Sequence, residues 1–147
     1  MPCSRLLPIL AWLAATPLGA SPSGEAFGAA SGFAGVSRAL AVAVASEGRV
    51  AVGAQDGVWV AQPPGAARRV LRRAPVLDLV FEADGTLLVA TARGLFAVDV
   101  EARVVDLGPG PGASARQVRR VAAHAALRLA ATAGGIFAGE GRRLRRL

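Results

Sequence analysis

Three short segments of this 147-residue chain share one pattern. They read VGAQDGVW at residues 52–59, VATARGLF at 89–96 and AATAGGIF at 130–137. Each has a small residue at its second position, glycine at its sixth, an aliphatic residue at its seventh and an aromatic one at its eighth. The glycines are 37 and 41 residues apart. A period of about 40 residues indicates a repeat protein, and this limits the possible folds more than any other feature.

Each glycine is expected in the tight turn of a β-hairpin, because the central residues of such turns need positive φ. The predicted turn pairs are Asp56-Gly57, Arg93-Gly94 and Gly134-Gly135. A further strand is predicted before and after each hairpin. The expected strands cover residues 39–44, 49–54, 58–62 and 67–73 in the first copy, 77–82, 86–91, 95–100 and 102–108 in the second, and 118–124, 127–132, 136–140 and 141–147 in the third.

Four short strands per repeat are typical of one blade of a β-propeller. The sequence therefore predicts an all-β fold, a partial β-propeller of about three four-stranded antiparallel blades at residues 36–74, 75–113 and 114–147. Residues 39–45 and 87–90 are apolar without alternation, which indicates sheets covered on both faces. Residues 114–129 also show helical spacing, but the repeat favours strands there.

The segment GTLLVATARGLFAVD, residues 85–99, resembles the repeat of sensory propellers of two-component regulators. It is similar, more loosely, to the repeats of photosystem II assembly-factor-like and WD40/YVTN-like propellers. The matching positions are Gly85, Thr91, Gly94, Leu95, Phe96 and Asp99. The resemblance covers about residues 36–147 and implies structural roles for these positions, with no catalytic or ligand-binding role.

The N-terminus has the three-part layout of a secretory signal peptide. A short basic region precedes ten apolar residues at 6–15, and small residues end at a predicted cleavage site after Ala20. This apolar run, expected as a signal helix, is too short to span a membrane. Residues 21–35 are rich in small residues and predict a flexible linker. We expect a periplasmic or secreted protein without a membrane span after cleavage, which would also remove Cys3, its only cysteine.

Residues with catalytic potential are sparse. The chain has no phosphate-binding loop or dinucleotide fingerprint, and its single histidine, His124, has no sequence motif around it. We therefore expect no catalytic, cofactor-binding or metal-binding residues and no enzymatic activity. Asp78 stands in an apolar strand and is expected to form a turn or blade-to-blade hydrogen bond, since a buried carboxylate needs a partner. The alternative places Asp78 on the central channel of the propeller.

The basic residues are all arginines, and the formal net charge is +7. Aromatic residues do not alternate with the arginine clusters, so no specific nucleic-acid binding is expected. Two clusters fall on predicted outermost strands, where charge prevents edge-to-edge pairing of sheets. The functional alternative is an anion-binding rim formed by Arg68, Arg69, Arg72, Arg73, Arg142, Arg143, Arg145 and Arg146.

Complete propellers typically have four to eight blades. We therefore expect this chain to be a truncated or partial propeller that is completed by missing C-terminal blades or by self-association. The favoured function is an exported, non-catalytic module that acts as a binding scaffold or sensory domain for a protein partner. One alternative is a fragment of a propeller hydrolase or lactonase whose active residues lie in missing blades. Another is a lectin-like ring of several chains, which would need sugar-accessible aromatic residues.

Overall fold

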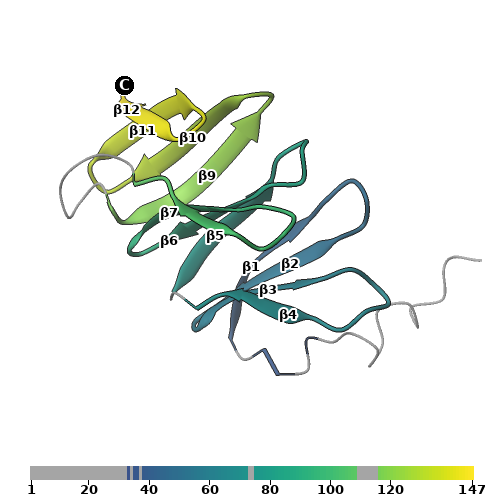
Figure 1. The fold of residues 1–147 in the computed structure, drawn as a ribbon. Coiled ribbons are helices and arrows are strands. Elements are labelled where there is room, and N and C mark those ends of the chain that lie inside the picture. Colours follow the sequence, from purple (N-terminus) through teal and green to yellow (C-terminus); the bar gives the residue numbers. More distant parts are fainter. Residues whose placement is uncertain (1–32, 34, 37, 73–74, 109–115) are drawn as a thin grey trace, which may run out of the picture.

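Three four-stranded antiparallel sheets follow one another along the chain (Figure 1). The computed structural model describes residues 33, 35–36, 38–72, 75–108 and 116–147. The predicted signal peptide, nearly all of the predicted linker, and Arg73 lie outside the described residues. In each sheet every strand pairs with the next one along the chain.

The first sheet contains β1 (Ala39–Val44), β2 (Val50–Ala54), β3 (Gly57–Ala61) and β4 (Arg68–Leu71). The second contains β5 (Val76–Phe81), β6 (Leu87–Thr91), β7 (Gly94–Val98) and β8 (Val104–Asp106), and the third contains β9 (Val118–His124), β10 (Leu127–Thr132), β11 (Gly135–Glu140) and β12 (Arg143–Arg146). The predicted all-β fold with three blade-like sheets is confirmed. Strands β9 and β10 occupy most of the segment that also showed helical spacing, so the strand interpretation is correct there.

The sheets contact one another mainly through their first strands, β1 with β5 and β5 with β9. This stacking creates two apolar cores. One lies between the first and second sheets around Val58, Val89 and Phe96, and the other lies between the second and third sheets around Leu88, Leu95 and Phe137. All residues of β6 and β7 are buried, because both faces of the middle sheet are covered. This explains the continuous apolar run in β6.

The same expectation is wrong for β1, whose apolar residues were predicted to be covered on both sides. Ala41 and Ala43 pack against the core between the first and second sheets, whereas Val42 is 67% exposed. Successive side chains of a strand point to opposite faces, and the exposure of Val42 shows that the second face is open at β1. The apolar sequence of a strand indicates that both of its faces can be buried, but it does not show whether another sheet packs against each face.

The hairpin glycines have positive φ, as expected: 139° at Gly57, 151° at Gly94 and 124° at Gly135. Their place in the turn differs from the prediction. Gly57 pairs with Ala54, so it begins the second strand of the hairpin, and the two central turn residues precede it. The other two hairpins have the same register. At Gly57 a side chain is also sterically excluded, since a Cβ atom would lie 2.0 Å from the carbonyl oxygen of Leu71.

Another glycine, Gly53, determines how closely the first and second sheets approach. A Cβ atom on Gly53 would lie 2.4 Å from Cγ1 of Val76 and 3.3 Å from Cδ1 of Leu79. Both residues belong to β5, the strand of the second sheet that lies against the first. The missing side chain therefore allows the backbone of β2 to pack directly against β5.

Candidate functional site

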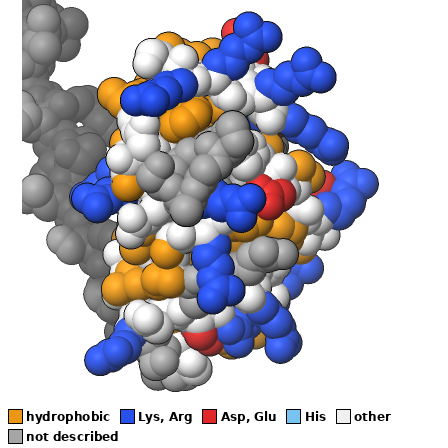
Figure 2. All heavy atoms as spheres, turned by 90° about the vertical axis from the view of Figure 1, so that its left-hand side faces the viewer, with side chains coloured by type: hydrophobic (Ala, Val, Ile, Leu, Met, Phe, Trp, Pro, Cys, Tyr) orange, Lys and Arg blue, Asp and Glu red, His pale blue; other side chains and the backbone are white. Residues whose placement is uncertain are grey.

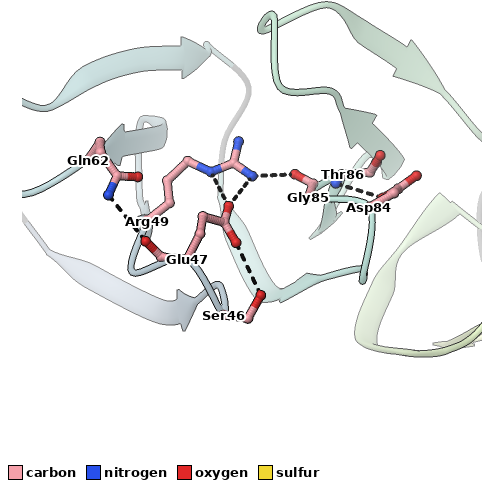
Figure 3. A network of polar contacts seen from close by, with 7 residues as sticks. All are labelled: Ser46, Glu47, Arg49, Gln62, Asp84, Gly85 and Thr86. Atoms are coloured by element: carbon pink, nitrogen blue, oxygen red, sulfur yellow. Dashed lines mark hydrogen bonds and ion pairs between the residues drawn. The ribbon is translucent and has the colours of Figure 1, made fainter.

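Arginine side chains connect neighbouring sheets. Arg49, just before β2, donates to Oε1 of Glu47 from both Nε and Nη2, and Nη2 also donates to the carbonyl oxygen of Gly85 at 2.7 Å (Figure 3). Gly85 lies in the turn between β5 and β6, so this contact joins the first sheet to the second. The guanidinium also lies over the ring of Phe81, 4.9 Å from its centroid. Arg49 therefore has a structural role at this junction.

Arg128 joins the second and third sheets through an ion pair that is less exposed than the pair of Arg49 with Glu47. Its Nε donates to Oε1 of Glu82 at 2.7 Å, and its Nη2 donates to Oε2 at 2.6 Å. The side chains of Arg128 and Glu82 are 14% and 6% exposed. The hydrogen bonds to Glu82 raise the pKa of Arg128 above its usual value, so the guanidinium remains charged. Arg128 also donates to the carbonyl oxygen of Gly141 in its own sheet.

Asp78 forms a blade-to-blade hydrogen bond, one of the two structural roles expected from the sequence. Its Oδ2 accepts the backbone N–H of Val121 at 3.0 Å, and its Oδ1 lies 3.8 Å from Nη1 of Arg120. β9 is an edge strand, so the N–H of Val121 has no strand partner on that side. The carboxylate supplies the missing acceptor.

Threonine hydroxyls stabilise two of the three repeated hairpins. Thr91 Oγ1 donates to the carbonyl oxygen of Gly94 and accepts the N–H of Arg93. Thr132 makes the corresponding contacts in the third sheet, with Gly135 and Gly134. The first copy has Ala54 at this position and lacks the hydroxyl. In the second and third hairpins the backbone groups of Arg93, Gly94, Gly134 and Gly135 thus take part in hydrogen bonds within the turn.

Carboxylates in other turns accept backbone N–H groups in the same way. Oδ1 of Asp84 accepts the N–H of Thr86 at 2.9 Å, and this hydrogen bond lowers the pKa of Asp84 below its ordinary value of 3.8. Asp99, one of the positions in the family resemblance, accepts N–H groups and the guanidinium of Arg103. The hydrogen bond from the Arg103 side chain is the main cause of the lowered pKa of Asp99.

The aromatic residues of the second and third repeats face the preceding sheet. Phe96 is 2% exposed in the core shared with the first sheet, and Phe137 is 6% exposed in the core shared with the second. Neither ring can stack on a sugar, and this removes two of the three aromatics on which the lectin alternative depends. Trp59 occupies the same repeat position in the first sheet, where the guanidinium of Arg69 lies 5.7 Å from its ring centroid.

The eight arginines of the predicted rim do not form one surface. Arg68 and Arg69 are on β4 in the first sheet, whereas Arg143 and Arg145 are on β12 in the third, with the middle sheet between them. Arg69 is already engaged, since its Nη2 lies 3.0 Å from Oδ2 of Asp56. In the described part of the chain, the arginines on and beside β12 have no acidic partner; they are Arg142, Arg143, Arg145 and Arg146. Figure 2 shows arginines outnumbering acidic side chains on one side of the molecule.

Neither a metal-binding cluster nor a membrane-spanning helix is found among the residues that the structure describes. They contain no group of three or more His, Cys, Asp or Glu side chains suited to hold a metal ion. His124 is exposed at the end of β9. No helix in the described ranges is both long enough and apolar enough to cross a bilayer.

Sequence reasoning missed the polar contacts between sheets other than that of Asp78. Arg49, Glu82 and Arg128 stand singly beside strands, and no motif distinguishes them from ordinary surface charges. Their partners lie 36 and 46 residues away along the chain, close to one repeat period. That spacing is the one signal that could have indicated them.

No family model and no curated protein matches this chain. The solved structures that resemble it include the following three. A chain of the mitotic checkpoint complex is 18% identical, with a TM-score of 0.57 over 71% of this chain and 35% of that one. Virginiamycin B lyase from Staphylococcus aureus is 11% identical, with a TM-score of 0.59 over 75% and 41%. PorZ, a surface component of the type-IX secretion system of Porphyromonas gingivalis, is 11% identical, with a TM-score of 0.57 over 74% and 16%.

The aligned regions span less than half of each of these longer chains. At such low identity the likeness concerns the fold alone. Together with the three stacked sheets, it shows that the described residues form a series of β-propeller blades.

Proposed function

We propose that this chain is an exported, non-catalytic β-propeller module that acts as a binding scaffold or sensory domain, and that it binds an acidic protein segment. The arginines on and beside β12 carry the proposal. All four are exposed, and they form no ion pair among the described residues. Arg49 and Arg128, in contrast, are engaged at the junctions between sheets.

The chemistry of these arginines suits carboxylates. A guanidinium presents a planar set of donors that matches a carboxylate, and it remains charged at all physiological pH values. β12 is also the outermost strand of its sheet, where charge protects the edge from pairing with other strands. The binding role and the protective role predict different behaviour toward an acidic peptide, so one titration separates them.

The test titrates the purified chain with a fluorescent oligoglutamate peptide. Replacing the β12 group by glutamine (R142Q, R143Q, R145Q and R146Q together) is expected to weaken binding at least tenfold. The matched control removes four exposed arginines elsewhere and lowers the net charge equally (R38Q, R93Q, R116Q and R119Q together). Equal losses in the two variants would indicate nonspecific attraction and would refute a defined site, and so would absence of binding to the unmodified chain.

Export is tested separately. Residues 1–20 fused to alkaline phosphatase are expected to give enzyme activity in a bacterial host, because that enzyme becomes active only after export. Leu10→Arg, which places a charge in the apolar region, should abolish the activity. N-terminal sequencing of the exported chain should begin at Ser21. An active Leu10→Arg fusion, or a mature chain that retains Met1, would contradict this part of the proposal.

A further inference from the structure

We propose that the two end sheets of the stack bind each other across two copies of this chain, the open face of β1–β4 against the open face of β9–β12. This inference goes beyond the proposed function, because it concerns how the blades are completed rather than what they bind.

The repeat gives each sheet two distinct faces. Val89 and its partner Phe96 pack toward the first sheet, and Ala130 and its partner Phe137 pack toward the second. We call this side of each sheet its preceding-type face, because it looks toward the sheet that comes earlier in the chain. In the first sheet the same positions are Val52 and Trp59, and Val52 pairs with Trp59 on one side and with Val42 on the other. Directly paired residues share a face, so the preceding-type face of the first sheet includes the exposed Val42.

The other face of each sheet, its next-type face, looks toward the next sheet along the chain. Its seventh-position aliphatic residue is fully buried in the first two sheets, as Val58 and Leu95. The same position in the third sheet is Ile136, which is 53% exposed. Ala131 is expected on this next-type face because it pairs with Ile136. Leu129 and Ala138 are expected there too, because they pair with each other and each is next in sequence to a residue of the preceding-type face. The open faces at the two ends of the stack are therefore of opposite type.

These are the same two types of face that meet at both junctions within the chain. A second copy offers a next-type face to Val42 and Trp59, and it offers a preceding-type face to Ile136. A head-to-tail contact between copies would thus reproduce a junction that this sequence already forms twice.

The area of the faces favours a closed pair. Four strands of about five residues present roughly 300 Å² per face, from strand spacing and rise per residue. One junction would bury roughly 600 Å², below the size of a stable specific interface, whereas a ring of two copies with two junctions would bury roughly 1,200 Å². Two chains of three sheets each would then form a ring of six blades.

The experiment measures the mass of the purified chain by sedimentation velocity and light scattering. The unmodified chain is expected to be a dimer. Val42→Glu and Ile136→Glu each place a charge on one open face at an exposed position, and each should give a monomer with an unchanged far-UV circular dichroism spectrum. Val100→Glu is the matched control, because Val100 is 56% exposed in a turn of the middle sheet. It should remain a dimer.

Mixing the two monomeric variants tests the head-to-tail geometry. The Val42→Glu chain keeps an intact next-type face and the Ile136→Glu chain keeps an intact preceding-type face. They should form a mixed dimer with one junction, which is weaker than the unmodified ring and visible at high concentration. No mixed dimer would overturn the head-to-tail arrangement, and a folded monomeric unmodified chain, or association insensitive to both variants, would overturn the proposal. A monomer that still binds oligoglutamate would leave the proposed function intact.

Discussion

Replacing Glu82 with glutamine tests how strongly polar contacts hold the second and third sheets together. The substitution keeps the side-chain shape but removes the charge that pairs with Arg128, and both side chains are nearly buried. Breaking a buried ion pair by removing one partner costs about 3–5 kcal/mol, because the other charge is left uncompensated. Arg128 keeps its hydrogen bond to the carbonyl oxygen of Gly141, so we expect the lower end of that range, about 3 kcal/mol.

The measurement is urea unfolding followed by circular dichroism at one fixed protein concentration. A loss of about 3 kcal/mol lowers the urea midpoint by about 1–3 M for a protein of this size. Asp99→Asn is the control, because it breaks the exposed ion pair of Asp99 with Arg103. Exposed ion pairs contribute little to stability, so the urea midpoint of this variant should hardly move. The apolar double variant Glu82→Leu with Arg128→Met should recover most of the lost stability.

Two results would refute this reasoning. If Glu82→Gln and Asp99→Asn lower the midpoint equally, burial does not strengthen the contact between the sheets. If the double variant is as unstable as Glu82→Gln, the loss comes from packing and not from an uncompensated charge.

Three further predictions concern the first two sheets. Gly53→Ala should lower the free energy of unfolding by about 1–3 kcal/mol, because the new Cβ atom would overlap Val76. Gly35→Ala is the control in the same urea titration and should have little effect, because a Cβ atom there would have no other atom within 4 Å. Equal effects of the two substitutions would contradict the steric explanation. Thr91→Val should cost about 1–3 kcal/mol in thermal unfolding, because the buried hairpin loses the hydroxyl that satisfies two backbone groups, and an unchanged midpoint would show that the hydroxyl is dispensable. The pKa of Asp84 is lowered in the folded chain, so the contribution of this carboxylate to stability is present above pH 3.8 and is lost as the pH falls below that value. Asp84→Asn should flatten this part of the curve of stability against pH. An unaltered curve would refute the assignment of the pH dependence to Asp84.

The sequence by itself determined the local plan of the protein. The recurring glycines and the short apolar runs around them predicted nearly all strand positions and the antiparallel order of each sheet. These features depend on backbone geometry and on contacts between neighbours in the chain, which short sequence patterns encode. The structural role of Asp78 was also predictable, because a carboxylate within an apolar strand needs a hydrogen-bond partner.

Only the tertiary structure decided which apolar faces are covered and which charges are paired. β1 and β6 have similar apolar sequences, yet β6 is buried on both faces while Val42 of β1 is exposed. Arg128 and the β12 arginines look alike in the sequence, yet only Arg128 meets a buried carboxylate, 46 residues away. The physical reason is that burial and ion pairing depend on which sheet stacks against which, and stacking joins residues that are distant in the chain.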